Sequence, residues 1–166
     1  PRGLEDHPPN PPTNPFLTSH LRTALEAFIT SLGLMEKVAT FAVADLSSAL
    51  ESVRDSNGSL AVIVPSRDEF SHVMALEDEN IPARAEIRNE FEILVTARDL
   101  SHGDDGDRSC VDLKDNLIEA LLWSDLAVPG IICLPIEADP MIIEIDERRG
   151  REAWKITLQI RQQILS

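Results

Sequence analysis

The sequence predicts a two-layer α+β domain in which about three helices pack on one face of a mixed, mostly antiparallel sheet. Three segments each carry a single apolar stripe at helical spacing, and several others alternate between apolar and polar residues. The expected order is helix, strand, helix, two strands, helix and three strands. A chain of 166 residues, 43% of them hydrophobic, corresponds to one domain that can bury a core without disulfides or a metal.

Residues 1–15 are expected to lie outside this domain, which spans residues 16–166. They contain six prolines and almost no apolar side chains, a composition that favours extended polyproline conformations over helix. We interpret the segment as a tail or the remnant of a tag. An arm that becomes ordered on a neighbouring molecule is the alternative.

The first predicted helix covers residues 16–32, with Asn14 as its N-cap and Pro15 in its first turn. Gly33 is expected to end it. One stripe gathers the apolar side chains Leu17, Leu21, Ala24, Leu25, Phe28 and Leu32. A short strand at 38–43 follows.

Asp45 is expected to cap a second helix with the sequence LSSALESV, which places Leu46, Leu50 and Val53 on one face. The continuous run LAVIVP at 60–65 then predicts a strand covered on both sides. Residues 66–85 are polar and irregular. There, Phe70, Val73 and Met74 are expected to form either a helical turn or a loop that faces a partner.

Residues 86–99 predict the next strand, because apolar and polar side chains alternate along it. The expected buried side chains are Ile87, Phe91, Ile93, Val95 and Ala97. A third helix is expected at 110–126, with the VPG sequence after it as the stop. Its apolar stripe contains Cys110, Leu113, Leu117, Ala120 and Leu121. Two strands, 131–138 and 141–147, are expected on either side of Asp139 and Pro140.

The final segment, REAWKITLQIRQQILS, shows the strongest alternation in the chain. Its apolar side consists of Trp154, Ile156, Leu158, Ile160 and Ile164, interrupted only by Gln162. Its polar side carries Lys155, Thr157, Gln159, Arg161 and Gln163, with no acid among them. We expect the apolar side to be buried and the cationic side to remain available to an acidic neighbour.

Charge is distributed unevenly along the chain. The net charge is −14, yet residues 148–166 carry +4, so the first 147 residues carry −18. This balance argues against a surface that wraps DNA. An acidic body and a basic end can attract copies of the chain head to tail, with simple solvated charge as the alternative. The candidate interface residues are Arg148, Arg149, Arg151, Lys155, Arg161, Phe70 and Met74.

No cofactor, resident metal or enzymatic activity is expected. The sequence lacks a glycine-rich phosphate loop, a GxSxG elbow and an HExxH motif, and its four histidines fall at positions that predict no catalytic cleft. The loop SHGDDGDRS gathers His102, Asp104, Asp105 and Asp107, which could hold a calcium or magnesium ion. Its spacing does not match an EF-hand, and a solvated hairpin tip is the favoured interpretation.

Cys110 and Cys133 are expected to be buried free thiols, with a disulfide as the alternative. Trp123 and Trp154 are expected to be core or subunit-contact anchors. The chain has no tyrosine and only five Phe, so we expect no aromatic surface on which nucleic-acid bases could stack. No apolar run approaches the roughly 18 residues of a membrane span, so no membrane partner is expected.

The order of these elements, with the strand ending in ARD, the helix VDLKDNLIEALL and the closing strand AWKITLQIR, resembles the tail terminator proteins of long-tailed bacteriophages. The resemblance covers residues 16–164 of this chain. The family is that of the minor tail protein U-like terminators, including relatives in contractile tails. The resemblance implies a ring, usually of six copies, that caps the tail tube, ends its polymerisation and joins the tail to the neck. DNA would pass through the lumen without specific binding.

The resemblance also implies a structural virion protein that assembles in the bacterial cytoplasm. Its partners would be itself, the tube protein, the sheath protein in contractile tails, and a neck or connector protein. Three alternatives remain. The first is a head–tail connector, the second a cytoplasmic adaptor that binds a partner strand at a sheet edge, and the third a metal-dependent hydrolase that uses the acidic loop.

Overall fold

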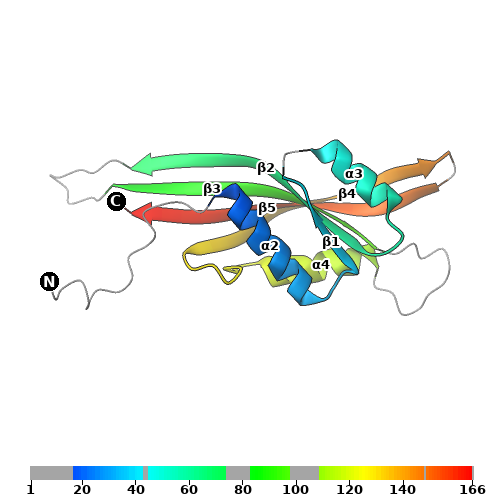
Figure 1. Ribbon diagram of the computed structural model, residues 1–166, viewed down its shortest axis with the longest axis horizontal. Coiled ribbons are helices and arrows are strands. Elements are labelled where there is room, and N and C mark those ends of the chain that lie inside the picture. The colour runs from blue at the N-terminus through cyan, green and yellow to red at the C-terminus, as the bar shows by residue number, and fades with distance from the viewer. Residues whose placement is uncertain (1–16, 43–44, 74–82, 98–108, 148, 166) are drawn as a thin grey trace.

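The computed structural model describes residues 17–42, 45–73, 83–97, 109–147 and 149–165, with backbone only for Val73, Asp146, Arg149 and Leu165. Three helices and a five-stranded mixed sheet make up this part of the chain, and the predicted α+β class is confirmed. The long strands give the molecule an elongated shape (Figure 1).

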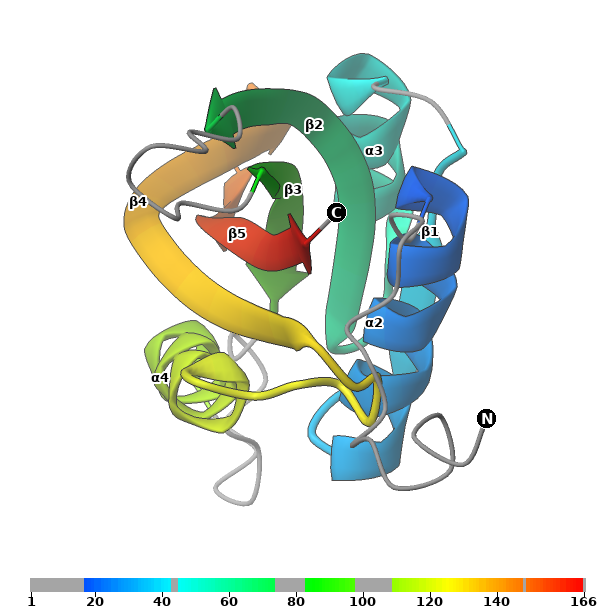
Figure 2. The ribbon, with the colours of Figure 1, turned by 90° about the vertical axis from the view of Figure 1, so that its left-hand side faces the viewer.

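The elements follow one another as three helices interleaved with five strands. They are α2 (Thr18–Leu32), β1 (Lys37–Thr40), α3 (Leu46–Asp55), β2 (Leu60–Val73), β3 (Arg84–Thr96), α4 (Cys110–Leu121), β4 (Ile131–Asp146) and β5 (Arg149–Leu165). The strand order is β1-β2-β3-β5-β4, in which β1 runs parallel to β2 and every other pair is antiparallel. The last strand is therefore inserted between β3 and β4. Viewed along the strands, the sheet is strongly curled (Figure 2).

The helices cover both faces of the sheet, and the prediction that all three share one face is wrong. Helices α2 and α4 pack on the face that carries Phe91 and Leu158. Helix α3 covers the opposite face, where Val53 meets Val62 and Leu94. The run at 60–65 supplies the reason, because a strand that is apolar on both sides needs cover on both sides.

Two of the predicted signals at the helix ends, Gly33 and Asp45, are confirmed. Gly33 follows α2 with φ 64°, a left-handed conformation that glycine adopts without steric cost. The Ser48 N–H donates to Asp45 Oδ1 at 3.0 Å, so Asp45 caps α3, and the hydrogen bonds from Ser48 lower the pKa of the Asp45 carboxyl. The predicted cap at Asn14 and Pro15 lies outside the described residues. Leu17, expected on the buried stripe, is 68% exposed.

Residues 66–73 belong to β2, so neither the predicted helical turn nor the predicted loop forms there. The strand continues because it pairs with β3 from Leu60 to Val73, with one irregularity between Pro65 and Arg67. Phe70 is therefore a strand residue. Met74 lies outside the described residues. Pairing with a distant segment has overridden the weak local preference of this polar sequence.

β4 is one continuous strand rather than two. It passes through Asp139 and Pro140 and stays paired with β5 on both sides of them. Proline is tolerated there because β4 lies at the edge of the sheet. α4 ends at Leu121, five residues before the predicted end, because the backbone of Trp123 turns to φ 65° and its N–H donates to the Cys133 carbonyl at 3.0 Å.

A network of buried polar side chains borders the core at the end where α2 begins. Gln162, the apparent interruption in the apolar side of β5, is 3% exposed, and its Nε2 donates to Asn89 Oδ1 at 2.6 Å. Asn89 Nδ2 donates in turn to Asp68 Oδ1 at 2.8 Å, and Thr18 Oγ1 donates to Asp68 Oδ2 at 3.2 Å. The network joins β5, β3, β2 and the start of α2, so the buried amides are satisfied by one another.

Replacing Gln162 with Leu leaves the buried Asn89 carboxamide without its donor. We expect Gln162→Leu to lower the free energy of unfolding by about 1–3 kcal/mol, measured by urea denaturation. Gln163→Leu, on the exposed side of the same strand, is the control and is expected to change it by about 0.5 kcal/mol or less. Equal effects of the two substitutions would contradict the network's role.

Candidate interaction surfaces

Four of the seven predicted interface residues have described side chains: Phe70, Arg151, Lys155 and Arg161. Met74 and Arg148 lie outside the described residues, as does the side chain of Arg149. The structure places Phe70 on β2 and the three cations on β5. They do not form one patch.

Arg151 is buried, with 7% of its surface exposed, and does not belong to a cationic surface as predicted. Its Nη2 donates to the carbonyls of Gly58 and Ala97, each at 2.9 Å, and its Nη1 donates to the Ser56 carbonyl. Its Nε donates to Thr96 Oγ1 at 3.0 Å. The planar guanidinium thus binds the α3–β2 turn and the end of β3 to the start of β5.

Lys155 and Arg161 are half-buried rather than free, because β5 lies inside the sheet with a neighbour on each edge. Lys155 is directly opposite Asp139 of β4. Arg161 Nε donates to Gln159 Oε1 at 2.7 Å and lies 3.9 Å from Glu86 Oε1 of β3. The predicted cationic face is therefore bordered by acids of the same chain. The position of β5 at the end of the chain gave no indication that it lies between β3 and β4.

Large apolar side chains are exposed at both ends of the long axis. β2 ends near one end of the molecule, and β4 ends near the other (Figure 1). Phe70, near the end of β2, is 62% exposed, and Ile142, near the end of β4, is 70% exposed. Because these two side chains lie near opposite ends of the molecule, we take them as candidate contact residues.

The turn after α4 presents a second apolar feature. Trp123 is 66% exposed and adopts a left-handed backbone conformation, as do Leu126 and Ala127. The turn is fixed nonetheless, since Leu126 is buried and the Ala127 N–H donates to Asp125 Oδ1 at 2.8 Å. Three such residues within five positions store backbone strain, a feature that concentrates at functional segments. Trp123 is thus suited to a contact.

Trp154, by contrast, packs against the main core. It is half-buried, and the Lys114 ammonium lies 4.3 Å from the centre of its ring. Of the two tryptophans, Trp154 therefore packs against the core, and Trp123 remains a candidate contact residue.

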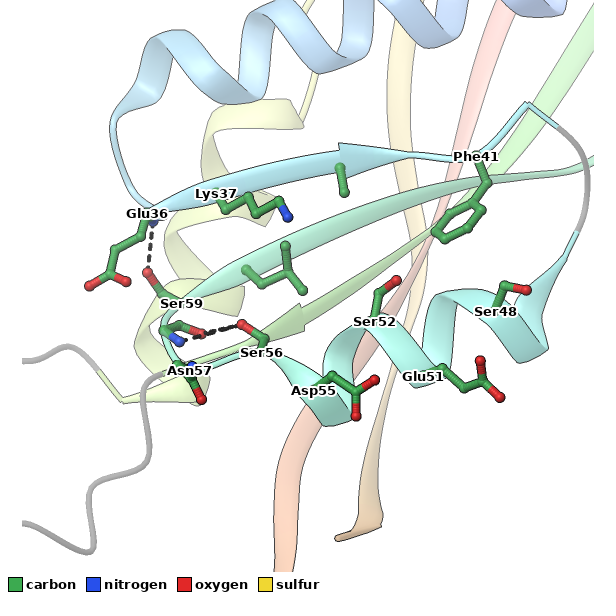
Figure 3. Close-up of a pocket in the computed structure, with 13 residues that line it drawn as sticks. Glu36, Lys37, Phe41, Ser48, Glu51, Ser52, Asp55, Ser56, Asn57 and Ser59 are labelled. Atoms are coloured by element: carbon green, nitrogen blue, oxygen red, sulfur yellow. Dashed lines mark hydrogen bonds between the residues drawn. The ribbon is translucent and has the colours of Figure 1, made fainter.

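A polar groove of about 740 Å³ lies between β1 and α3 (Figure 3). Glu51 and Asp55 approach it from α3, and Glu36 and Lys37 from the β1 side. Four serines line it, but no histidine is among the lining residues, so no imidazole is present to activate a serine as a nucleophile. The groove has a mildly acidic lining and no arrangement typical of a catalytic site.

Within the described residues, no three His, Cys, Asp or Glu side chains come together to hold a metal ion. The acidic loop with His102, Asp104, Asp105 and Asp107 lies outside these residues. Nor is any helix in the described part of the chain long and apolar enough to cross a membrane. Comparison of the sequence with models of known protein families and with curated proteins gave no match.

The loss of the Arg151 guanidinium is expected to be costly, because several carbonyls are left without their donor. We expect Arg151→Met to lower the free energy of unfolding by about 2–4 kcal/mol in urea denaturation. Arg151→Lys is expected to recover only part of this, since an ammonium cannot reproduce the planar fork. Arg54→Met, on an exposed part of α3, is the control, with an expected change of about 0.5 kcal/mol or less. A wild-type stability for Arg151→Met would contradict this role.

Both cysteines are free and buried, as predicted. Burial raises the pKa of the Cys110 thiol to about 11 and that of the Cys133 thiol to about 12. We therefore expect both to react slowly with Ellman's reagent at pH 8 in the folded chain and rapidly in urea. The folded chain keeps these protons where the unfolded chain loses them, so they make stability fall as the pH rises from about 9 towards 11. Rapid reaction of the native thiols would contradict their burial.

Proposed function

We propose that the chain is a structural subunit that assembles with copies of itself into a ring, and that the ring caps the tail tube of a bacteriophage. In this role it would end tube polymerisation and join the tail to the neck. The observation that carries the proposal is the elongated sheet with exposed apolar side chains at opposite ends, Phe70 at one and Ile142 at the other. Different patches at opposite ends favour the heterologous contacts from which rings are built.

The order and length of the elements support the assignment to a tail terminator. The structure contains the leading helix at 18–32, the charged strand at 84–96 and the closing strand at 149–165 on which the resemblance depends. The exposed Trp123, on a strained but fixed turn, adds a rigid aromatic contact residue of the kind that anchors protein interfaces.

The cations of β5 do not form the basic surface that the sequence predicted for contacts between copies. Arg151 is buried, and Lys155 and Arg161 lie in the middle of the sheet, so these side chains do not form a basic end. Copies with a net charge of −14 repel one another, and salt screens that repulsion. Assembly through apolar contacts should therefore strengthen with salt. Within the ring, the excess negative charge would repel DNA phosphates and let the genome slide.

A head–tail connector or other neck protein would share the ring habit, and binding to tubes separates the two roles. An adaptor that binds a partner's strand is the other candidate, favoured by the part of β2 that extends beyond β1.

Light scattering of the purified chain at micromolar concentration tests the ring. We expect a discrete multimer, six chains by the family resemblance, whose fraction rises from low to high salt, and rings in negative-stain images. The multimer should co-sediment with tail tubes and block their further growth. A monomer at every protein and salt concentration would contradict the ring. Rings that do not bind tail tubes would favour a connector.

A further inference from the structure

The outer edge of β2 is open over its second half. β1 pairs only with Leu60–Ile63, and its neighbour Phe41 donates its N–H to the Ile63 carbonyl at 3.0 Å. The odd-numbered residues at this end of β2 therefore direct their backbone groups towards β1. The irregularity between Pro65 and Arg67 shifts this alternation by one residue. Beyond it the even-numbered residues point outwards, and among the described strands none pairs with them.

The outward backbone groups thus belong to Asp68, Phe70 and His72. No proline follows Pro65 in this stretch, so each of the three residues retains an N–H donor. Open edges of this kind are sites where another strand adds to a sheet.

The outer edge of β4 is blocked at three points before its tip. At its start, the Cys133 N–H donates to the Ser124 carbonyl at 2.9 Å, so the turn after α4 occupies the edge. The same alternation directs Pro135 outwards, and after the shift between Pro135 and Glu137 it directs Pro140 outwards. A proline that points outwards removes the donor with which a second strand would pair.

Between the two prolines a single outward donor remains, the N–H of Ala138. The tip of β4, beyond Pro140, has two successive outward donors. They belong to Ile142 and Glu144, just before the turn to β5. This tip and the open part of β2 lie at opposite ends of the molecule (Figure 1). One copy therefore cannot bring its own two edges together.

The two edges match in direction and in face. β2 and β4 are separated by three antiparallel steps, so they run antiparallel to each other. Phe70 is opposite Ile87, and Ile142 is opposite Glu152, which places both on the face that carries α2 and α4. A second copy in the same orientation would bring its β4 tip antiparallel to β2 with Ile142 beside Phe70.

We propose that the open edge of β2, at Asp68–His72, pairs with the end of β4, at Pro140–Glu144, of the next copy. In this register Phe70 is opposite Ile142, and the His72 N–H donates to the Pro140 carbonyl. This inference rests on the proposed ring and names its interface. Each copy uses both edges once, so the contact is heterologous and continues from copy to copy until the ring closes. Main-chain hydrogen bonds provide the pairing, and Phe70 packs on Ile142 across the contact.

Cysteine cross-linking tests the pairing. Residues opposite each other in a hydrogen-bonded antiparallel pair have Cα atoms about 5.5 Å apart, within the range of a disulfide. We expect Phe70→Cys/Ile142→Cys, oxidised with copper phenanthroline, to give a ladder of covalent multimers on a non-reducing gel. A register shifted by two residues would pair Phe70 with Glu144, so Phe70→Cys/Glu144→Cys is oxidised in parallel. The native thiols are buried and should not contribute.

The matched control is Ser71→Cys/Ile142→Cys. Ser71 is exposed and adjacent to Phe70, but its side chain lies on the opposite face, so no ladder is expected. A covalent dimer from Phe70→Cys alone would indicate that two β2 strands pair with each other and would overturn the proposal. A ladder from neither β4 position, in samples that contain rings, would also overturn it and leave the ring standing. A chain that stays monomeric would contradict both.

A proline pair tests the backbone separately from the side chain. His72 directs its N–H outwards and Ser71 directs its N–H towards β3, so His72→Pro removes only a donor to the next copy. We expect His72→Pro to keep a melting temperature near that of the wild type and to lose the multimer in light scattering. Ser71→Pro should instead lower the melting temperature. A wild-type multimer in His72→Pro would argue against edge pairing.

Discussion

β5 is hydrogen-bonded along both of its edges, to β3 on one side and to β4 on the other. Its alternation sends Ile156, Leu158 and Ile160 into the core beneath α2 and α4, where all three are fully buried. The last strand of the chain is thus the one that closes the sheet. Without β5, β3 and β4 have no common neighbour in the sheet, and the main core lacks the side chains of β5.

Polar side chains mark both ends of this core. At one end the buried pair Asn89 and Gln162 completes its hydrogen bonds within the sheet and through Asp68. At the other end, Arg151 ties β5 to the α3–β2 turn and to the end of β3. Beyond these two points the strands continue as arms that carry exposed apolar side chains. A rigid middle with two different arms is a geometry suited to head-to-tail assembly.

The two outer edges of the sheet differ, and in the proposed assembly this difference would set the direction of pairing. The turn after α4, Pro135 and Pro140 interrupt the β4 edge at three points before its tip. Beyond Pro65, no strand in the described part of the chain covers the outer edge of β2, and no proline interrupts it up to Val73. A sheet that could pair at every point of both edges would aggregate without register, whereas two short open segments limit the positions at which copies can pair.

Local sequence determined the features whose causes lie within a few residues. The left-handed stop at Gly33, the Asp45 cap and the alternation of β5 are of this kind, because backbone sterics and side-chain period act at short range. Of the candidate contact residues, Phe70 was found by its isolation in a polar stretch, but its place on a strand was not. Tertiary structure alone decided that 66–73 pairs with β3, that α3 covers the second face and that Arg151 is buried. Each of these depends on backbone donors and carbonyls supplied by segments far away in the chain, which no local pattern records.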